Sequence, residues 1–180
     1  MTRLISVMVL SLTVVAGASA TANATEVGSA RRFGLGFQVG DPTAIIGKAF
    51  IGGENAIDFG VGFGGYGYNR CRDRNGNWHD CGGYGNDLSL HADLLWQENL
   101  THQQVKLDWH LGGGARMIFW NSFENQGGYV ALIGRMPIGL DLSFQRPNFL
   151  EVFLEIAPGI QVFPRLWFEL DFALGVRFYF

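Results

Sequence analysis

The alternation of apolar and polar residues near the C-terminus is the feature that most limits how this chain can fold. From Leu166 to Phe180 every even-numbered residue is apolar, and Glu169, Asp171 and Arg177 lie between them. An α-helix would spread these three charged side chains around its circumference, whereas a β-strand places all of them on one face. The segment is therefore predicted to be a strand with one apolar face and one charged face.

The same alternation recurs along the chain and predicts eight strands in a single all-β domain. Turn-forming sequences such as Gly40–Thr43 and Phe163–Arg165 separate neighbouring strands. The predicted strands cover residues 33–39, 45–51, 57–63, 88–96, 105–111, 132–143, 150–156 and 166–180, with longer connections over residues 66–86, 97–104 and 120–128.

Residues 1–24 have the pattern of a secretory signal peptide. Arg3 is followed by an almost purely apolar segment, Leu4–Gly17, and then by two small-x-small sequences that end at Ala20 and Ala24. A membrane-anchoring helix is the alternative, but the apolar run is shorter than the roughly 20 residues that span a bilayer. We expect cleavage after Ala20 or Ala24, which leaves one exported domain over residues 25–180.

Two cysteines, Cys71 and Cys81, lie in a segment rich in turn-forming residues. An even number of cysteines in an exported protein favours a disulfide, which would stabilise this loop by about 2–3 kcal/mol. The alternative is a metal site that adds His79 and Asp80 to the two cysteines. We favour the disulfide because the paired-cysteine spacing of structural zinc sites is absent, and we expect neither a metal nor a cofactor.

Eight alternating strands fit either a soluble barrel with an apolar interior or a membrane barrel with an apolar exterior. The polar face is rich in Gly, Asp, Glu and Arg, which suits the narrow interior of an eight-stranded barrel better than a surface facing water. Aromatic residues, including Trp96, Phe119, Phe144 and Phe178, recur near strand ends as in the girdles of membrane barrels. We therefore predict an antiparallel, up-and-down transmembrane barrel preceded by a cleaved signal peptide.

The charged residues of the inward face are expected to form a packed network that fills the barrel. A buried charge without a partner costs several kcal/mol, so these groups are expected to be paired or hydrated. Carboxylates outnumber the permanent cations, which predicts bound protons or water among them. The predicted network contains Lys48, Asp58, His91, Asp93, Lys106, Asp108, His110, Arg116, Arg135, Asp141, Glu151, Glu155, Glu169, Asp171 and Arg177.

Two sets of residues resemble bacterial outer-membrane proteins. The last six residues resemble the final strand that such proteins present to the barrel-assembly machinery, with Phe178 and Phe180 as the assembly signal. Other segments resemble a family of small, uncharacterised outer-membrane barrels that share the eight-stranded plan of the OmpA and OmpX barrels. These segments are Phe33–Thr43 with Gly47-Lys48, Ala56–Gly60, Leu90–Leu94 and Phe153–Pro158. The resemblance implies a location in the bacterial outer membrane but no established activity.

Ser89, His91 and Asp93 are the best catalytic candidates, because they share one face of one strand and have the residue types of a nucleophile, a base and an orienting acid. They would suit a lipid A deacylase or palmitoyltransferase. Residues two apart on a strand are roughly 6–7 Å apart, however, and these face the lumen rather than lipid. A structural role is favoured, as it is for His110 with Asp108.

The expected protein is a monomeric outer-membrane barrel with an envelope-structural role or a surface-binding role, and it is not an enzyme. Its partners would be outer-membrane lipid, lipopolysaccharide and the assembly machinery, and its net charge of −3 offers no basic surface for nucleic acid. A lipid A-modifying hydrolase or acyltransferase and a narrow porin are the two alternatives. Both termini are expected in the periplasm, with outer loops at residues 40–43, 66–86, 120–128 and 163–165.

Overall fold

The chain folds almost entirely into β-strands. A computed structural model describes residues 27–63, 70–72, 78–80, 88–102, 105–120 and 129–180. Nine strands form one antiparallel sheet: β1 (Phe33–Gly40), β2 (Thr43–Gly52), β3 (Asn55–Phe63), β6 (Leu88–His102), β7 (Val105–Trp120), β8 (Tyr129–Arg135), β9 (Ile138–Phe144), β10 (Leu150–Phe163) and β11 (Trp167–Tyr179). Two short strands, β4 (Arg70–Arg72) and β5 (Trp78–Asp80), form a separate hairpin. In the described part of the chain, no helix is long and apolar enough to cross a membrane.

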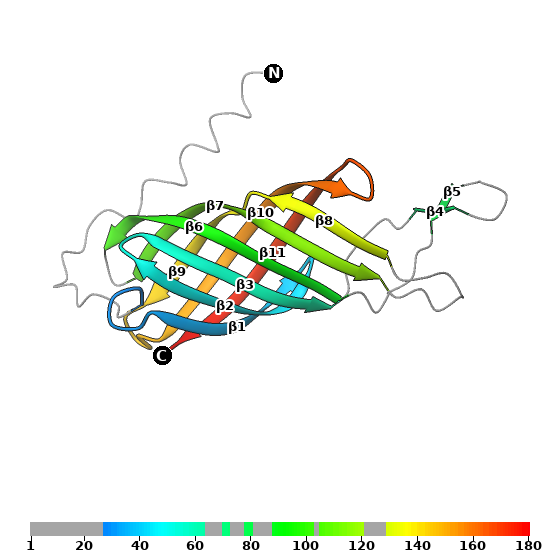
Figure 1. The fold of residues 1–180 in the computed structure, drawn as a ribbon. Helices are drawn as coiled ribbons and strands as arrows, with labels where there is room; N and C mark the ends of the chain where they lie inside the picture. The colour runs from blue at the N-terminus through cyan, green and yellow to red at the C-terminus, as the bar shows by residue number, and fades with distance from the viewer. Residues whose placement is uncertain (1–26, 64–69, 73–77, 81–87, 103–104, 121–128) are drawn as a thin grey trace, which may run out of the picture.

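The nine-stranded sheet closes on itself through its first and last strands. Phe37 of β1 lies opposite Ile45 of β2 on one side and opposite Val176 of β11 on the other. β11 also pairs with β10, so the ring of strands is complete (Figure 1). Closure leaves no unpaired edge between β1 and β11.

The ring contains nine strands where the sequence predicted eight, because the predicted strand over residues 132–143 is divided at Met136-Pro137. Proline lacks the N–H group that a central strand must donate. The two parts, β8 and β9, both pair with β7 and β10, so they follow one another along the same position in the ring. Contact continues across the break, since Gly112 N donates to Pro137 O at 2.8 Å and Met136 N donates to Pro158 O at 2.9 Å.

Several strands extend beyond the predicted bounds, and the largest extensions are in β6, β7 and β10. The connection predicted at residues 97–104 is wrong in large part, because β6 continues to His102 and pairs with β7 as far as Lys106. The extension was not predicted because the polar residues that begin at Gln97 interrupt the alternation of apolar and polar residues. Likewise β7 passes through Gly112–Gly114, where a Cβ on Gly114 would lie 2.2 Å from Ala92 O. Gly112 and Gly114 therefore permit close contact with β6, whereas a Cβ on Gly113 would meet no atom within 4 Å.

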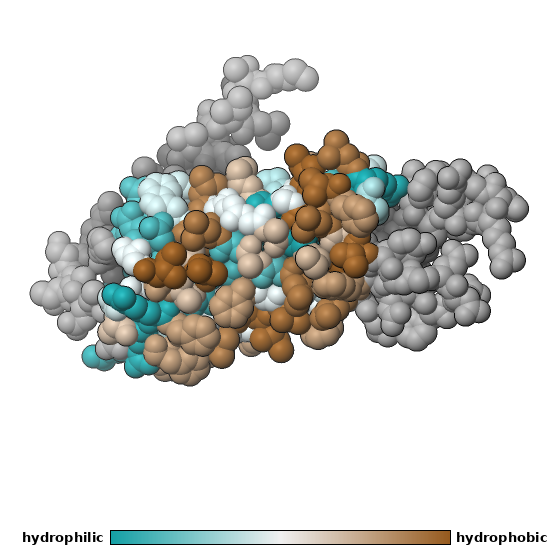
Figure 2. Space-filling model, in the orientation of Figure 1, coloured by the Kyte–Doolittle hydropathy of each residue, from teal (hydrophilic) through white to brown (hydrophobic). Residues whose placement is uncertain are grey.

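The two faces of the strands differ as the alternation indicates. On β11, Phe168 and Leu170 are 64% and 61% exposed, whereas the neighbouring Asp171 and Arg177 are 5% and 1% exposed. Figure 2 shows apolar side chains spread along the wall of the barrel on the face in view. The apolar face points outward and the charged face points into the barrel.

Candidate functional site

The interior of the barrel gathers charged side chains from β2, β3 and β6 to β11. Strand geometry turns every second residue inward, so each strand contributes at spacings of two. The structure places the residues of the predicted network as follows: Lys48, Asp58, His91, Asp93, Asp108, His110, Arg116, Arg135, Asp141, Glu151, Glu155, Asp171 and Arg177 are buried, and Lys106 and Glu169 are half-buried.

Asp141 on β9 is the centre of one cluster. Its Oδ2 accepts a hydrogen bond from Lys48 Nζ at 3.0 Å and another from Gln97 Nε2 at 2.6 Å. His110 Nδ1 lies 2.8 Å from the same oxygen, and Arg177 Nη1 donates to Oδ1 at 3.4 Å. One carboxylate thus connects β9 to strands β2, β6, β7 and β11.

Arg177 on β11 extends this cluster across the barrel. Its Nη1 donates to Glu151 Oε1 at 2.9 Å, and its Nη2 donates to Asp58 on β3. The guanidinium carbon lies 3.7 Å from the centre of the Phe153 ring, which is a cation–π contact. Tyr179 Oη donates to the same oxygen of Glu151 at 3.1 Å. The charge of Arg177 is therefore paired on several sides.

Arg135 on β8 is the centre of a second cluster. Its Nη2 donates to Glu155 Oε1 and its Nη1 donates to Asp171 Oδ2 at 3.4 Å. Asp93 Oδ2 lies 3.4 Å from Arg135 Nε, which makes a third ion pair. Arg116 Nη1 also donates to Asp171, at 2.8 Å. Arg135 thus connects β8 to β6, β10 and β11, and β7 joins the cluster through Asp171.

His110 joins the two clusters. Its Nδ1 faces Asp141 in the first cluster, and its Nε2 lies 3.3 Å from Glu155 Oε2 in the second. At the other end of the second cluster, Arg116 Nη2 donates to Asp41 Oδ1 at 3.0 Å. A continuous series of polar contacts therefore runs from Tyr179, near the chain terminus, to Asp41 in the β1–β2 turn.

The catalytic candidates are not assembled into a nucleophile–base pair. Ser89, His91 and Asp93 are all buried inside the barrel. Among the described residues, neither Ser89 Oγ nor His91 Nδ1 has a hydrogen-bond partner. Asp93 pairs with Arg135 instead of orienting His91.

Asp108 and His110 are also not paired with each other. Asp108 accepts a hydrogen bond from Asn99 Nδ2 at 2.7 Å, and its other oxygen lies 2.7 Å from Lys106 Nζ. His110 faces Asp141 and Glu155. The two residues belong to separate groups of contacts.

The cysteine pair lies only partly within the described residues. Cys71 is in β4, opposite His79 in β5, whereas Cys81 lies outside the described residues. The disulfide therefore stays a prediction. In the part of the chain that the structure describes, no group of three or more His, Cys, Asp or Glu residues is arranged to hold a metal ion.

Three participants in the network were not identified from the sequence. The sequence predicted Gln97 in a loop and Asp41 in a turn. It predicted Tyr179 in the last strand but gave it no place in the charged network. Gln97 and Tyr179 have the same odd-numbered spacing as the inward charges of β6 and β11, which could have identified them. No comparable signal marked Asp41.

Comparisons with known proteins identify a family that the chain matches and a solved structure with a similar fold. The sequence profile of a family described as "Protein of unknown function (DUF3996)" matches residues 24–180. Among solved structures, the N-terminal β-barrel domain of Pseudomonas aeruginosa OprF is similar, with a TM-score of 0.57 and 13% identity. The match covers 83% of this chain and 96% of the OprF domain, and at this identity it shows a likeness of fold. No curated protein matches the chain.

Proposed function

We propose that this chain, which belongs to the DUF3996 family of proteins of unknown function, is an integral barrel of a bacterial outer membrane with a structural or surface-binding role. The observation that carries the proposal is the inversion of the usual burial pattern. Phe168 and Leu170 are exposed on the outer wall, while Asp141 and Lys48 are fully buried. Water favours the opposite arrangement, and hydrocarbon favours this one.

The closed sheet supports the same environment. Lipid offers no hydrogen bonds, so a spanning sheet must pair every strand and close. The β1–β11 pairing supplies that closure, and the fold is similar to that of the OprF barrel domain. The ring has eight strand positions when β8 and β9 are counted as one, as in the small outer-membrane barrels that the sequence resembles.

The charged network is proposed to fill the lumen and to block solute passage. Lys48 of β2 reaches Asp141 of β9, and Arg116 of β7 reaches Asp171 of β11, so side chains bridge the interior at two levels. A narrow porin is the competing function. Planar-bilayer recordings of the purified protein should show no stable open channel, and sustained conductance would favour the porin.

The surface-binding role would belong to the end of the barrel opposite the termini. Strand direction places the β1–β2, β3–β6, β7–β8 and β10–β11 connections together at that end. If the termini lie in the periplasm, these connections face outward and include the segment with Cys71 and Cys81. We propose that they contact lipopolysaccharide, another surface or a host molecule.

Membrane fractionation combined with heat-modifiable gel migration tests the proposal. The full chain, expressed with residues 1–24, should appear in the outer-membrane fraction as a monomer and migrate faster unheated than boiled, because a closed barrel resists unfolding by detergent. Chain that stays in the soluble periplasmic fraction, or that shows one mobility under both conditions, would contradict it. Protease added to intact cells should cut within residues 64–87 and leave the barrel strands protected.

A further inference from the structure

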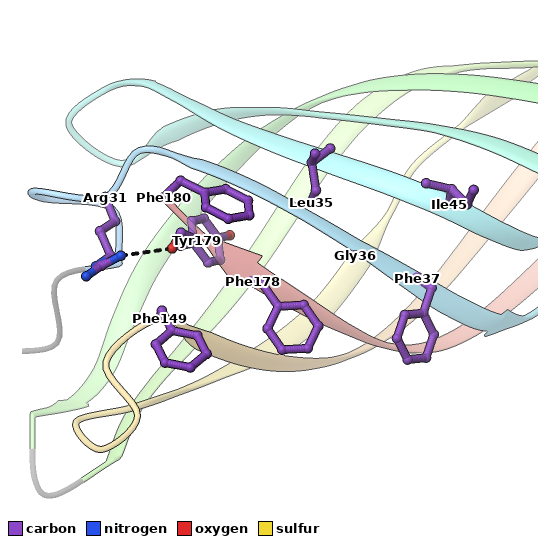
Figure 3. A pocket seen from close by; sticks show the side chains of 9 residues that line it. All are labelled: Arg31, Leu35, Gly36, Phe37, Ile45, Phe149, Phe178, Tyr179 and Phe180. Carbon is purple, nitrogen blue, oxygen red and sulfur yellow. Dashed lines mark hydrogen bonds between the residues drawn. The ribbon is translucent and has the colours of Figure 1, made fainter.

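A shallow apolar groove lies on the outside of the barrel at the end where the chain terminates. It has a volume of about 580 Å³ and is formed mainly by side chains of β1 and β11 and by the turn before β10 (Figure 3). Its walls include Leu35, Phe37, Phe149 and Phe178. Phe149 and Phe178 stack with ring centres 6.3 Å apart, so this wall is ordered by packing.

The groove is apolar along its length and positively charged at one end. Phe178 lies between Arg31, at the end near the terminus, and Phe37, farther along β1 (Figure 3). Arg31 Nη1 donates to Tyr179 O at 3.2 Å, which holds the guanidinium at this end of the groove. Arg32 places a second cation beside it in the sequence. The groove therefore has the polarity of a molecule with an anionic head and an apolar tail.

We propose that this groove binds one glycerophospholipid, with its phosphate at Arg31 and an acyl chain along Phe178 and Phe37. The inference rests on the proposed function, because it requires the groove to face a bilayer. Guanidinium groups form strong, directional hydrogen bonds with phosphate oxygens. Arg31 lies two residues before the start of β1 at the terminal end of the barrel, where the headgroups of the periplasmic leaflet would lie.

Native mass spectrometry of the full chain in mild detergent tests the site. After delipidation, the protein is titrated separately with phosphatidylglycerol and with diacylglycerol of the same acyl composition. The wild type should form a one-to-one complex with phosphatidylglycerol and bind diacylglycerol more weakly, because diacylglycerol lacks the phosphate.

Variants separate the headgroup contact from the acyl contact. Arg31→Gln should lower phosphatidylglycerol binding about fivefold and leave diacylglycerol binding unchanged. Phe37→Ala should weaken both lipids. Arg146→Gln, at an exposed position that does not line the groove, and Phe172→Ala, which is 52% exposed against 55% for Phe37, are matched controls and should behave as the wild type.

Three results would overturn the proposal: equal binding of both lipids by the wild type, unchanged phosphatidylglycerol binding by Arg31→Gln, or a dimer mass in place of the lipid complex. The last result would mean that a second copy covers the groove. Heat-modifiable migration of each variant distinguishes failure of this site from failure of the barrel assignment. A chain without that migration would refute both.

Discussion

Lys48 Nζ lies 3.0 Å from Asp141 Oδ2, although 93 residues separate the two in the sequence. Both side chains are fully buried, and their contact joins β2 to β9 across the barrel. Such pairs do little for net stability relative to apolar packing, but they become costly when one partner is removed. The interior is therefore sensitive to substitutions that neutralise one charge and leave its partner unpaired.

Replacing the central carboxylate should test this sensitivity. Asp141→Leu leaves Lys48, Arg177 and His110 without their shared acceptor and should lower the free energy of unfolding by about 3–5 kcal/mol. Urea titration of protein in lipid vesicles would measure the change. Glu54→Leu, at an exposed position, is the control and should change stability by less than about 1 kcal/mol. Equal effects of the two substitutions would show that Asp141 is not central.

A charged residue on the outer wall should lower stability more when it lies deeper in the bilayer. Leu170→Arg, within β11, should lower stability by about 2–4 kcal/mol if it lies near the bilayer midplane. Leu166→Arg, just before β11, should cost only about 0–1 kcal/mol because it lies near the interface. Both wild-type side chains are exposed, so burial does not explain the difference. Comparable costs in lipid vesicles would contradict the assignment of this face to lipid.

Two adjacent glycines of β7 should differ in their tolerance of a methyl group. A Cβ on Gly114 would lie 2.2 Å from Ala92 O, so the two strands must move apart. A Cβ on Gly113 would meet no atom within 4 Å. Gly114→Ala should therefore destabilise by about 1–3 kcal/mol, whereas Gly113→Ala should be neutral or slightly stabilising. The same unfolding titration measures both, and the reverse order would place the wrong residue at the strand contact.

Ser89→Ala and His91→Ala should leave lipid A chemistry unchanged. Ser89 Oγ and His91 Nδ1 make no hydrogen bond within the described structure, and both side chains are inside the barrel. Mass spectrometry of lipid A from cells expressing each variant or the wild type would measure acylation. A difference that requires both residues would revive the enzyme hypothesis.

The cysteine pair should be oxidised without being required for the barrel. Thiol alkylation of the unreduced protein should label neither cysteine. The double variant Cys71→Ser/Cys81→Ser should retain heat-modifiable migration, because β4 and β5 form a sheet separate from the ring. Alkylation of both cysteines before reduction would show that the disulfide is absent.

The sequence predicted the strands and their faces better than it predicted which side chains contact one another. The alternation identified the two faces of β11 because successive side chains of a strand point to opposite faces whatever the neighbouring strands are. It did not show that Pro137 divides one strand into β8 and β9, because the neighbouring apolar residues keep the period on both sides. The extension of β6 beyond Trp96 was missed because polar residues there point both inward and outward.

The contacts inside the barrel depend on how the ring of strands closes. The sequence therefore predicted which residues face inward but not which of them form pairs. The inward direction of Lys48 follows from its strand, but the choice of Asp141 among several carboxylates depends on register across the whole ring. Gln97 shares that acceptor for the same reason. The signal peptide, the cleavage position and the disulfide remain predictions, since residues 1–26 and Cys81 lie outside the described part.

The pairing of β1 with β11 has a consequence for biogenesis. The strand made first finds one of its two neighbours only when the strand made last has been synthesised, so the cylinder cannot be completed while the ribosome is still at work. Until then the emerging polypeptide must be kept from aggregating through its open margins, and a premature stop codon anywhere before β11 would leave a product that never closes.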